Sequence, residues 1–262
     1  MVVRPKKSLG QNFLIDKNII NIITELGNIS NKDNVLEIGP GTGNLTEHIL
    51  EKHPKQLVVI EKDTKLSIKL REKFQNKIQI VNDDILKVNE KEMFKEQMIV
   101  FGNLPYNISS QILVKWLKLN DLNLYSRRFI LMFQKEVADR IIANFNEKNY
   151  GRLSILTYWK MNVKKIKDVS PKSFYPAPKV ESTILFMEPK KKFFKFNNPK
   201  SLEYITNIFF NQKRKMIKKP MNLLFQNSQI IANKLKLDLS SRPQNLSPEN
   251  YFQICKEYES LH

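Results

Sequence analysis

The sequence predicts an α/β domain followed by a small all-helical domain. The first observation is an alternation of short β-branched or apolar runs with helical stretches, from residue 34 to about residue 187. Such alternation is typical of a parallel sheet with helices on both faces. The second is a change of character near Pro189, after which only helical patterns follow. We therefore expect one domain over residues 1–188 and a second over residues 189–262.

Five runs are predicted to be parallel strands: 34–38, 57–61, 77–82, 98–102 and 127–133. The helices expected between them cover 45–52, 65–74, 109–119 and 135–145. Two further apolar runs, 153–163 and 180–187, are separated by the proline-rich segment 170–178. That segment cannot be α-helix, because each proline disfavours the helical conformation of the residue before it. We expect the two runs to be strands that close the sheet with an antiparallel edge.

Beyond a polar linker at 190–200, the helical patterns cover 202–210, 221–225, 230–237 and 248–258. Ser247 followed by Pro248 is typical of a helix start, with serine as the N-cap and proline in the first turn.

The chain is strongly basic, with a net charge of +18 and a pI near 9.8. From residue 171 onward there are 16 Lys and Arg against 7 Asp and Glu, so the basic density is highest in the last third. This charge favours a polyanionic partner, nucleic acid first and an anionic membrane second. The alternative is a solvated, lysine-rich surface without a partner.

Cysteine and histidine usage argues against a metal site. Cys255 is the single cysteine, and His48, His53 and His262 lack metal-ligand spacing. The first residues have positive charge without a following apolar stretch, and no apolar run is long enough to span a membrane. We therefore expect a cytoplasmic protein that is monomeric and binds no metal.

A glycine-rich turn follows the first predicted strand, in the pattern Gly39-Pro-Gly-Thr-Gly43. Glycines there let the backbone turn tightly and approach a ligand closely. The pattern is neither that of a P-loop nor that of dinucleotide binders, and it suits a nucleoside cofactor without phosphate, such as S-adenosylmethionine. The alternative is a turn that serves only helix–sheet packing.

Acidic residues end the next two strands. Glu61 can accept hydrogen bonds from both hydroxyls of a ribose, and Asp83 or Asp84 can accept a hydrogen bond from an adenine amino group. Both would lie with the glycine turn at one edge of the sheet. The alternative is a set of exposed acids at strand ends.

The tetrapeptide Asn103-Leu-Pro-Tyr106 indicates the chemistry. An adenine amino nitrogen is a poor nucleophile, and its lone pair must be localised and aimed. The side-chain oxygen of Asn103 and the carbonyl of Leu104 can each accept one N6 hydrogen, while Pro105 fixes the loop and Tyr106 offers a face for stacking. We therefore expect methyl transfer to adenine N6. The alternative is an ordinary Asn-Pro turn after a strand.

Two further segments are candidates for ligand contacts. Gln11, Asn12 and Leu14 lie in a segment that can fold over the cofactor, with a plain helix cap as the alternative. Phosphate contacts are expected from Lys213, Arg214, Lys215, Lys218 and Lys219. If this segment is helical, Lys215, Lys218 and Lys219 would share one face of the helix. The alternative for these cations is a solvated surface. Phe174 and Tyr175 can stack a base or pack the sheet edge.

Six segments together resemble the KsgA-type 16S (small-subunit) rRNA adenine N6,N6-dimethyltransferases. They read SLGQNFL at 8–14, EIGPGTGNLT at 37–46, GNLPYN at 102–107, QKEVADR at 134–140, FYPAPKVES at 174–182 and RPQNLSPE at 242–249. The resemblance runs over essentially the whole chain. It implies a class I, Rossmann-like methyltransferase domain and a small helical RNA-binding domain. It also implies dimethylation of two adjacent adenosines in a loop near the 3′ end of 16S rRNA, within the small ribosomal subunit.

The resemblance further implies roles for individual residues. Cofactor contacts fall on Asn12, Leu14, Gly39, Glu61, Asp84 and Asn103, to which the turn and lid residues Gly41 and Gln11 are added. Leu104 and Tyr106 frame the target base. Asp84 aligns better than Asp83, because it directly precedes the pair Ile85-Leu86.

Three alternatives remain open from the sequence. One is a 23S rRNA enzyme with the same chemistry, as in the macrolide-resistance branch. Another is an RNA-binding assembly or transcription factor without turnover, which the intact 103–106 motif disfavours. The third is DNA adenine methylation, which is disfavoured because no sizeable target-recognition domain is left over.

Overall fold

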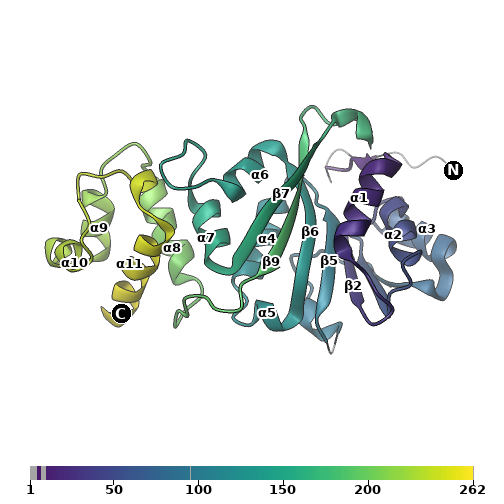
Figure 1. The fold of residues 1–262 in the computed structure, drawn as a ribbon, viewed down its shortest axis with the longest axis horizontal. Helices are drawn as coiled ribbons and strands as arrows, with labels where there is room; N and C mark the ends of the chain where they lie inside the picture. Colours follow the sequence, from purple (N-terminus) through teal and green to yellow (C-terminus); the bar gives the residue numbers. More distant parts are fainter. Residues whose placement is uncertain (1–4, 7–9, 95, 262) are drawn as a thin grey trace. The chain divides into compact units, whose positions relative to one another are not determined.

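The computed structural model describes residues 5–6, 10–94 and 96–261, and its main feature is a seven-stranded sheet (Figure 1). The strand order is β4-β3-β2-β5-β6-β9-β7. Strands β2 to β6 run parallel to one another, whereas β9 pairs antiparallel with β6. The bounds are β2 Asn34–Ile38, β3 Gln56–Ile60, β4 Gln79–Val81, β5 Met98–Asn103, β6 Ser126–Gln134, β7 Met161–Val169 and β9 Ser182–Pro189. The predicted fold class is thereby confirmed.

Three helices cover one face of this sheet: α1 (Lys17–Gly27), α2 (Asn44–Leu50) and α3 (Thr64–Phe74). Their buried apolar side chains share one core cluster with alternate residues of the strands, such as Val35 and Phe101. Helix α1 was not predicted from the sequence. Its start is set by Asp16, whose carboxylate accepts from the backbone N–H groups of Asn18 and Ile19.

A second, two-stranded sheet joins segments far apart in the chain. Strand β1 (Phe13–Leu14) pairs antiparallel with β8 (Phe174–Tyr175), which lies in the proline-rich segment. That segment, all of whose residues are described, has no α-helix, as expected; it begins with one 3-10 turn, Pro171–Ser173. The pairing attaches the N-terminal segment to the body of the domain.

The prediction of a strand over 153–163 was wrong. The structure has helix α7 (Arg152–Lys160) there, and the strand β7 begins only at Met161. Seven of the nine residues of α7 are buried, including the polar Ser154, Thr157 and Lys160, so the helix does not divide into an apolar buried face and a polar exposed face. A buried helix without a polar face cannot be distinguished from a buried strand by periodicity.

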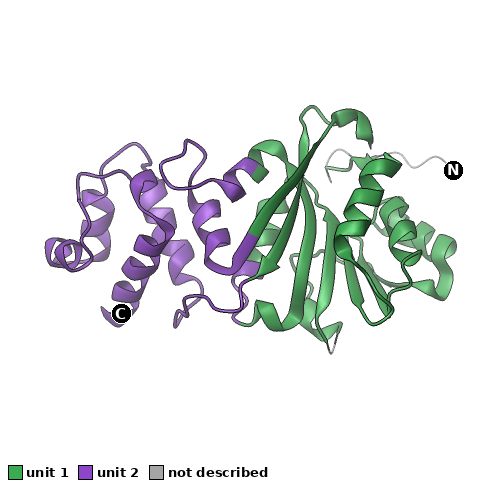
Figure 2. Ribbon diagram, viewed as in Figure 1, with its two compact units in different colours: residues 1–115, 121–138, 163–189 green, residues 116–120, 139–162, 190–262 purple. Residues whose placement is uncertain are grey.

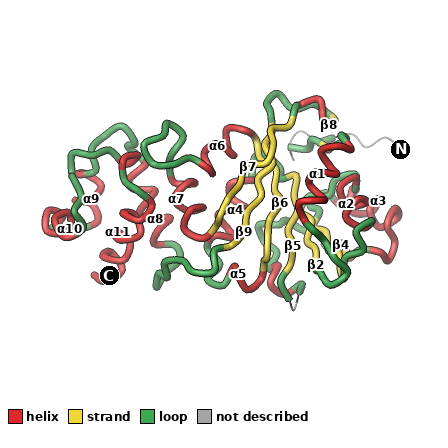
Figure 3. The backbone as a smooth tube through the Cα atoms, viewed as in Figure 1, coloured by secondary structure: helices red, strands yellow, loops and turns green. Residues whose placement is uncertain are grey.

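The remaining helices lie close to their predicted positions, except the short helix Leu122–Tyr125, which was not predicted. They are α4 (Ser109–Leu117), α5 (Leu122–Tyr125), α6 (Lys135–Ile142), α8 (Ser201–Phe210), α9 (Lys218–Leu224), α10 (Ser228–Lys234) and α11 (Pro248–Leu261), with short 3-10 turns at Gln75–Lys77, Glu90–Glu92 and Pro243–Asn245. The hydroxyl of Ser247 accepts from the backbone N–H of Asn250 at 3.3 Å, so the predicted N-cap is present. From residue 190 onward Figure 3 shows helices and loops alone.

The chain divides into two compact units (Figure 2). The first contains residues 1–115, 121–138 and 163–189, and the second contains 116–120, 139–162 and 190–262. The second unit has its own aromatic core, in which Phe209 packs edge-on against Tyr251 at 5.3 Å between ring centres. The sequence-based division at residue 188 did not assign 116–120 and 139–162 to this unit.

Candidate active site

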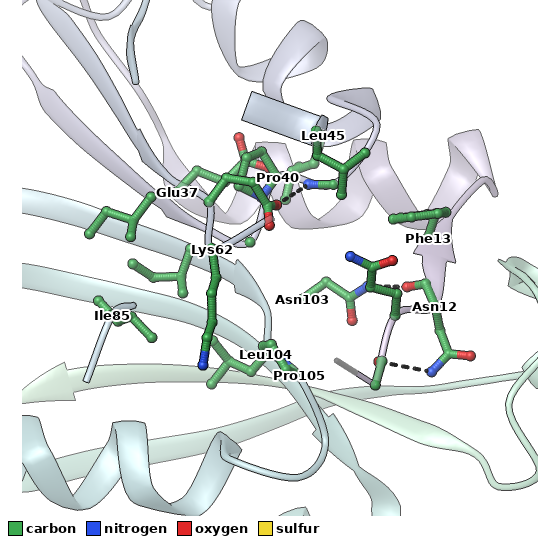
Figure 4. Close-up of a pocket in the computed structure, with 18 of the residues that line it drawn as sticks. Asn12, Phe13, Glu37, Pro40, Leu45, Lys62, Ile85, Asn103, Leu104 and Pro105 are labelled. Carbon is green, nitrogen blue, oxygen red and sulfur yellow. Dashed lines mark hydrogen bonds between the residues drawn. The ribbon is translucent and has the colours of Figure 1, made fainter. Parts of the chain in front are cut away.

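A pocket in the first unit opens where β2, β3 and β5 reach their carboxyl ends (Figure 4). Its walls are formed by the N-terminal segment, the glycine turn, the ends of the strands and the loop after β5. Ligands of open α/β sheets bind at this edge. The pocket brings together all residues predicted to contact cofactor or target base: Gln11, Asn12, Leu14, Gly39, Gly41, Glu61, Asp84, Asn103, Leu104 and Tyr106.

The glycine turn adopts a backbone that other residues rarely adopt. Gly39, Gly41 and Gly43 all have positive φ, at +65°, +59° and +80°. A Cβ atom on Gly41 would lie 2.7 Å from the ring of Phe13, so this ring packs directly on the turn. A Cβ on Gly39 would meet no atom nearer than 3.9 Å, which leaves the space beside Gly39 open to a ligand.

Glu61 follows β3 and is 6% exposed. Its two carboxylate oxygens accept from the backbone N–H groups of Asp63, at 2.8 Å, and Gly41, at 3.2 Å. Burial raises the pKa of this carboxyl, and the two hydrogen bonds act in the opposite direction. Each oxygen keeps a second lone pair, so a ligand diol can still be bound by both.

Asp63 attaches the N-terminal segment to the pocket, a role that the sequence analysis missed. This buried carboxylate caps α3 through the N–H of Lys65. It also forms an ion pair with Lys6 at 2.8 Å and accepts from the side-chain amide of Gln11 at 3.2 Å. Although burial acts against it, these bonds hold the pKa of Asp63 below its usual range. The signal in the sequence was its place just before a helical pattern, as an N-cap.

Glu37, on β2 beneath the glycine turn, was also missed. It lines the pocket, is 2% exposed, and accepts a hydrogen bond from the hydroxyl of Thr46 at 2.7 Å. Burial raises its pKa to about 8, and the nearby charge of Glu61 acts in the same direction. An acid within an otherwise apolar strand was the signal that pointed to it.

The side chain of Asn103 has a defined orientation. Its Nδ2 donates to the backbone oxygen of Asn12 at 2.8 Å, and Figure 4 shows this bond across the pocket. Only the NH₂ end of an amide can donate to a carbonyl, so this bond also fixes the position of Oδ1. Within the described residues no group donates to that oxygen, which leaves an acceptor for a ligand.

Tyr106 is held from the opposite side. Its hydroxyl lies 2.7 Å from the hydroxyl of Ser182, a fully buried residue at the start of β9. Burial raises the pKa of Tyr106, so its phenol is neutral at physiological pH. Leu104, the other predicted target-base residue, is 1% exposed and lines the pocket with its neighbour Pro105.

Asp83 and Asp84 both line the pocket, and their surroundings differ. Asp84 forms an ion pair with Lys62 at 2.7 Å and accepts from the N–H of Leu86, and these bonds lower its pKa. Asp83 accepts from the N–H of Asp84 and from no other group among the residues that the structure describes. Asp84 is therefore fixed in position, whereas Asp83 is exposed.

The predicted cationic cluster lies in the second unit. Helix α9 begins only at Lys218, so the expectation that Lys215, Lys218 and Lys219 share one helical face was wrong. These three lysines nevertheless line one shallow groove, which we call the basic groove; it consists of Gln212, Lys215, Met216, Lys218, Lys219, Asn222 and Leu223. Lys213 is used internally, because its Nζ donates to the carbonyls of Lys148 and Tyr150. Arg214 is exposed beside the groove-lining residues in sequence.

The described residues contain neither a metal-binding cluster nor a membrane-spanning helix. Within that part of the chain, no three His, Cys, Asp or Glu side chains are grouped so as to hold a metal ion. Nor is any described helix both long and apolar enough to span a bilayer.

Comparisons with known proteins agree with the geometry. The family model "Ribosomal RNA adenine dimethylase" matches residues 2–260. "Ribosomal RNA small subunit methyltransferase A" of Pelagibacter ubique (strain HTCC1062) is 57% identical over 261 residues, covering 100% of this chain and 99% of the relative. Its counterpart in Ehrlichia chaffeensis is 40% identical over 258 residues and covers 96% of each chain.

Solved structures are also similar. A dimethyladenosine transferase from Plasmodium falciparum superposes with a TM-score of 0.78 at 27% identity, covering 95% of this chain and 98% of that one. The 23S rRNA methyltransferase ErmE superposes with a TM-score of 0.69 at 23% identity, covering 95% and 100%, and this match shows the fold alone. The chain therefore belongs to the ribosomal RNA adenine dimethylase family.

Proposed function

We infer that this protein is an S-adenosylmethionine-dependent rRNA adenine dimethyltransferase that acts on the small ribosomal subunit. Its substrate would be two adjacent adenosines in a loop near the 3′ end of 16S rRNA, each converted to N6,N6-dimethyladenosine. The relatives named above support the substrate class, because they are small-subunit rRNA methyltransferases. The observation that carries the chemistry is the orientation of Asn103, whose free oxygen lines the pocket.

The pocket residues fit S-adenosylmethionine. The space beside Gly39 is open, Glu61 offers two oxygens to a ribose, and Asp84 or Asp83 can accept from the adenine amino group. Leu14, Asn12, Gln11 and Gly41 would complete the enclosure. When bound, the cofactor supplies an electrophilic methyl group on a sulfonium.

Asn103 would prepare the nucleophile. Its Oδ1 and the carbonyl of Leu104 would each accept one N6 hydrogen, drawing the nitrogen lone pair out of the ring and toward the methyl carbon. Tyr106 would stack on the base, with its ring held by Ser182. After transfer the nitrogen is cationic and its proton is strongly acidic, so the proposal requires no side-chain base.

The second transfer has a geometric requirement. Once one methyl is attached, a single N6 hydrogen remains, and only one of the two acceptors can be used. The pocket must therefore leave room for a methyl group beside Asn103 or Leu104.

The second unit would provide RNA affinity, as proposed for residues 189–262. Arg214, Lys215, Lys218 and Lys219 are exposed and would contact phosphates, with Arg214 suited to a bidentate contact. Lys213 would contribute less, because its Nζ is already bonded to two carbonyls and burial lowers its pKa. The pocket is built from one chain, so we propose that the protein acts as a monomer.

Incubation with purified subunits tests the function. The protein and S-adenosylmethionine would be mixed with immature small subunits, large subunits or an isolated hairpin, and the rRNA would be analysed by mass spectrometry. Dimethyladenosine should form in 16S rRNA within the subunit and weakly or not at all in the hairpin, because a loop base must be presented in the correct shape. Equal rates on subunit and hairpin, or preferential modification of 23S rRNA, would contradict the proposal.

A further inference from the structure

The basic groove contains more than cations. Two of its lining side chains are apolar and largely exposed: Met216 is 58% exposed and Leu223 is 67% exposed. A phosphate-tracking surface requires neither. Exposed apolar side chains gathered in a hollow are typical of a surface that a partner covers.

The charge of the groove indicates what kind of partner. No carboxylate lines it, and within the described residues the side-chain ammonium groups of Lys215, Lys218 and Lys219 form no ion pair or hydrogen bond. Other lysines of the same unit are engaged, such as Lys234, which pairs with Glu257 at 2.8 Å. The groove therefore presents three available cations to a polyanion.

The amide groups of the groove add hydrogen-bonding capacity. Asn222 accepts from the hydroxyl of Ser228 through Oδ1, which leaves its NH₂ group as a donor. Gln212 adds a second amide. Donors, apolar contacts and cations together match a nucleobase with its flanking phosphates. A hollow receives a protruding group, and paired bases inside a duplex do not protrude.

We propose that the basic groove binds one unpaired nucleotide of an RNA, with its base against Met216 and Leu223 and its phosphates on the three lysines. The proposal rests on the inferred action on rRNA and adds a contact that involves no residue of the pocket. The groove would then distinguish RNAs by shape, because it would bind an RNA that has an extruded base more tightly than one that has none.

Two hairpin RNAs test this with the full-length chain. They differ by one nucleotide: in the first a 2-aminopurine is a single-nucleotide bulge, and in the second an added uridine on the opposite strand pairs with it. Wild type should bind the bulged hairpin about fivefold or more tightly, with a change in 2-aminopurine emission. Replacing Met216 and Leu223 together by Ala should abolish this preference and leave the salt dependence unchanged. Replacing Lys215 and Lys218 by Ala should weaken binding of both hairpins and lower the log–log salt slope by about 1–2.

A matched control is Ile230→Ala, which removes an apolar side chain that is 64% exposed on α10 outside the groove. It should retain the preference for the bulge. Equal binding of both hairpins by wild type would overturn the proposal. So would binding to phosphatidylglycerol vesicles that depends on Met216 and Leu223 while binding to RNA does not.

Methylation of small subunits by wild type is measured separately, which distinguishes the two failures. Methylation without a bulge preference would overturn the role of the groove alone. A bulge preference without methylation would support the groove and overturn the proposed function.

Discussion

The pocket of the first unit and the basic groove of the second use their polar side chains in opposite ways. In the pocket, Asn103 and Tyr106 are already held by protein partners. In the groove, Lys215 and Lys218 have none among the described residues. Ordering a side chain costs free energy, so the pocket has met that cost on folding, whereas the groove meets it on binding. Substitutions in the pocket should therefore change rates, and those in the groove should change affinity.

The largest effect is expected for Asn103→Ala. Loss of the acceptor at the reacting centre should lower kcat by about 100-fold or more, because such groups act most strongly where charge develops. RNA affinity should remain within about twofold of wild type. Single-turnover methylation and filter binding measure the two quantities. A large loss of RNA affinity with a near-normal rate would erase the distinction between pocket and groove.

Glu61→Ala should come next. Removing hydrogen bonds to a charged acceptor costs about 1.5–3 kcal/mol, so the Kd for S-adenosylmethionine should rise by roughly 10- to 150-fold. The variant Glu61→Gln is the control, since it retains one oxygen for the N–H of Asp63. Calorimetry measures both affinities, and wild-type affinity in the Ala variant would remove Glu61 from the site.

The parts of the site that could be predicted are those whose sequence motifs directly follow a predicted strand. The glycine turn, Glu61 and the 103–106 loop follow predicted strands, and parallel strands bring their carboxyl ends together. Two contacts join segments that are distant in the chain: the pairing of β1 with β8, and the ion pair between Lys6 and Asp63. Neither segment of either contact carries a sequence pattern that would predict it. Helix α7 was mistaken for a strand because it is buried on most sides. These features depend on tertiary contacts that one sequence does not display.

A smaller effect should separate positioning from contact at Tyr106. Tyr106→Phe and Ser182→Ala each remove the same hydrogen bond, with a cost of about 0.5–1.5 kcal/mol. If the bond positions the ring, each variant should reduce kcat several-fold, and the double variant should be no worse than either single one. Rates for both methylation steps measure this, because the second transfer has fewer hydrogen bonds to orient the base. Additive losses would show that the two hydroxyls act independently.

An effect on stability, and not on rate or affinity, concerns pH and Glu37. Its folded pKa of about 8 lies above the ordinary value of 4.5, so the folded protein binds this proton more tightly than the unfolded chain does. The stabilisation is complete below about pH 4.5 and is lost as pH rises through 8. Glu37→Gln keeps an acceptor for Thr46 without the titration. Denaturation is measured at pH 5.5, 7 and 8.5. The free energy of unfolding of the variant should rise relative to that of wild type as pH rises, and an unchanged difference would contradict the assignment.

The bond between Asn103 and Asn12 has a consequence for synthesis of the chain. Residues 10–14 are synthesised before their partners, which are Asn44, Asn103 and the strand Phe174–Tyr175. The pairing of β1 with β8 can therefore form only after residue 175 has been translated. While the chain ends before residue 174, strand β1 lacks its partner β8, so the backbone that accepts from the amide of Asn103 is not yet anchored.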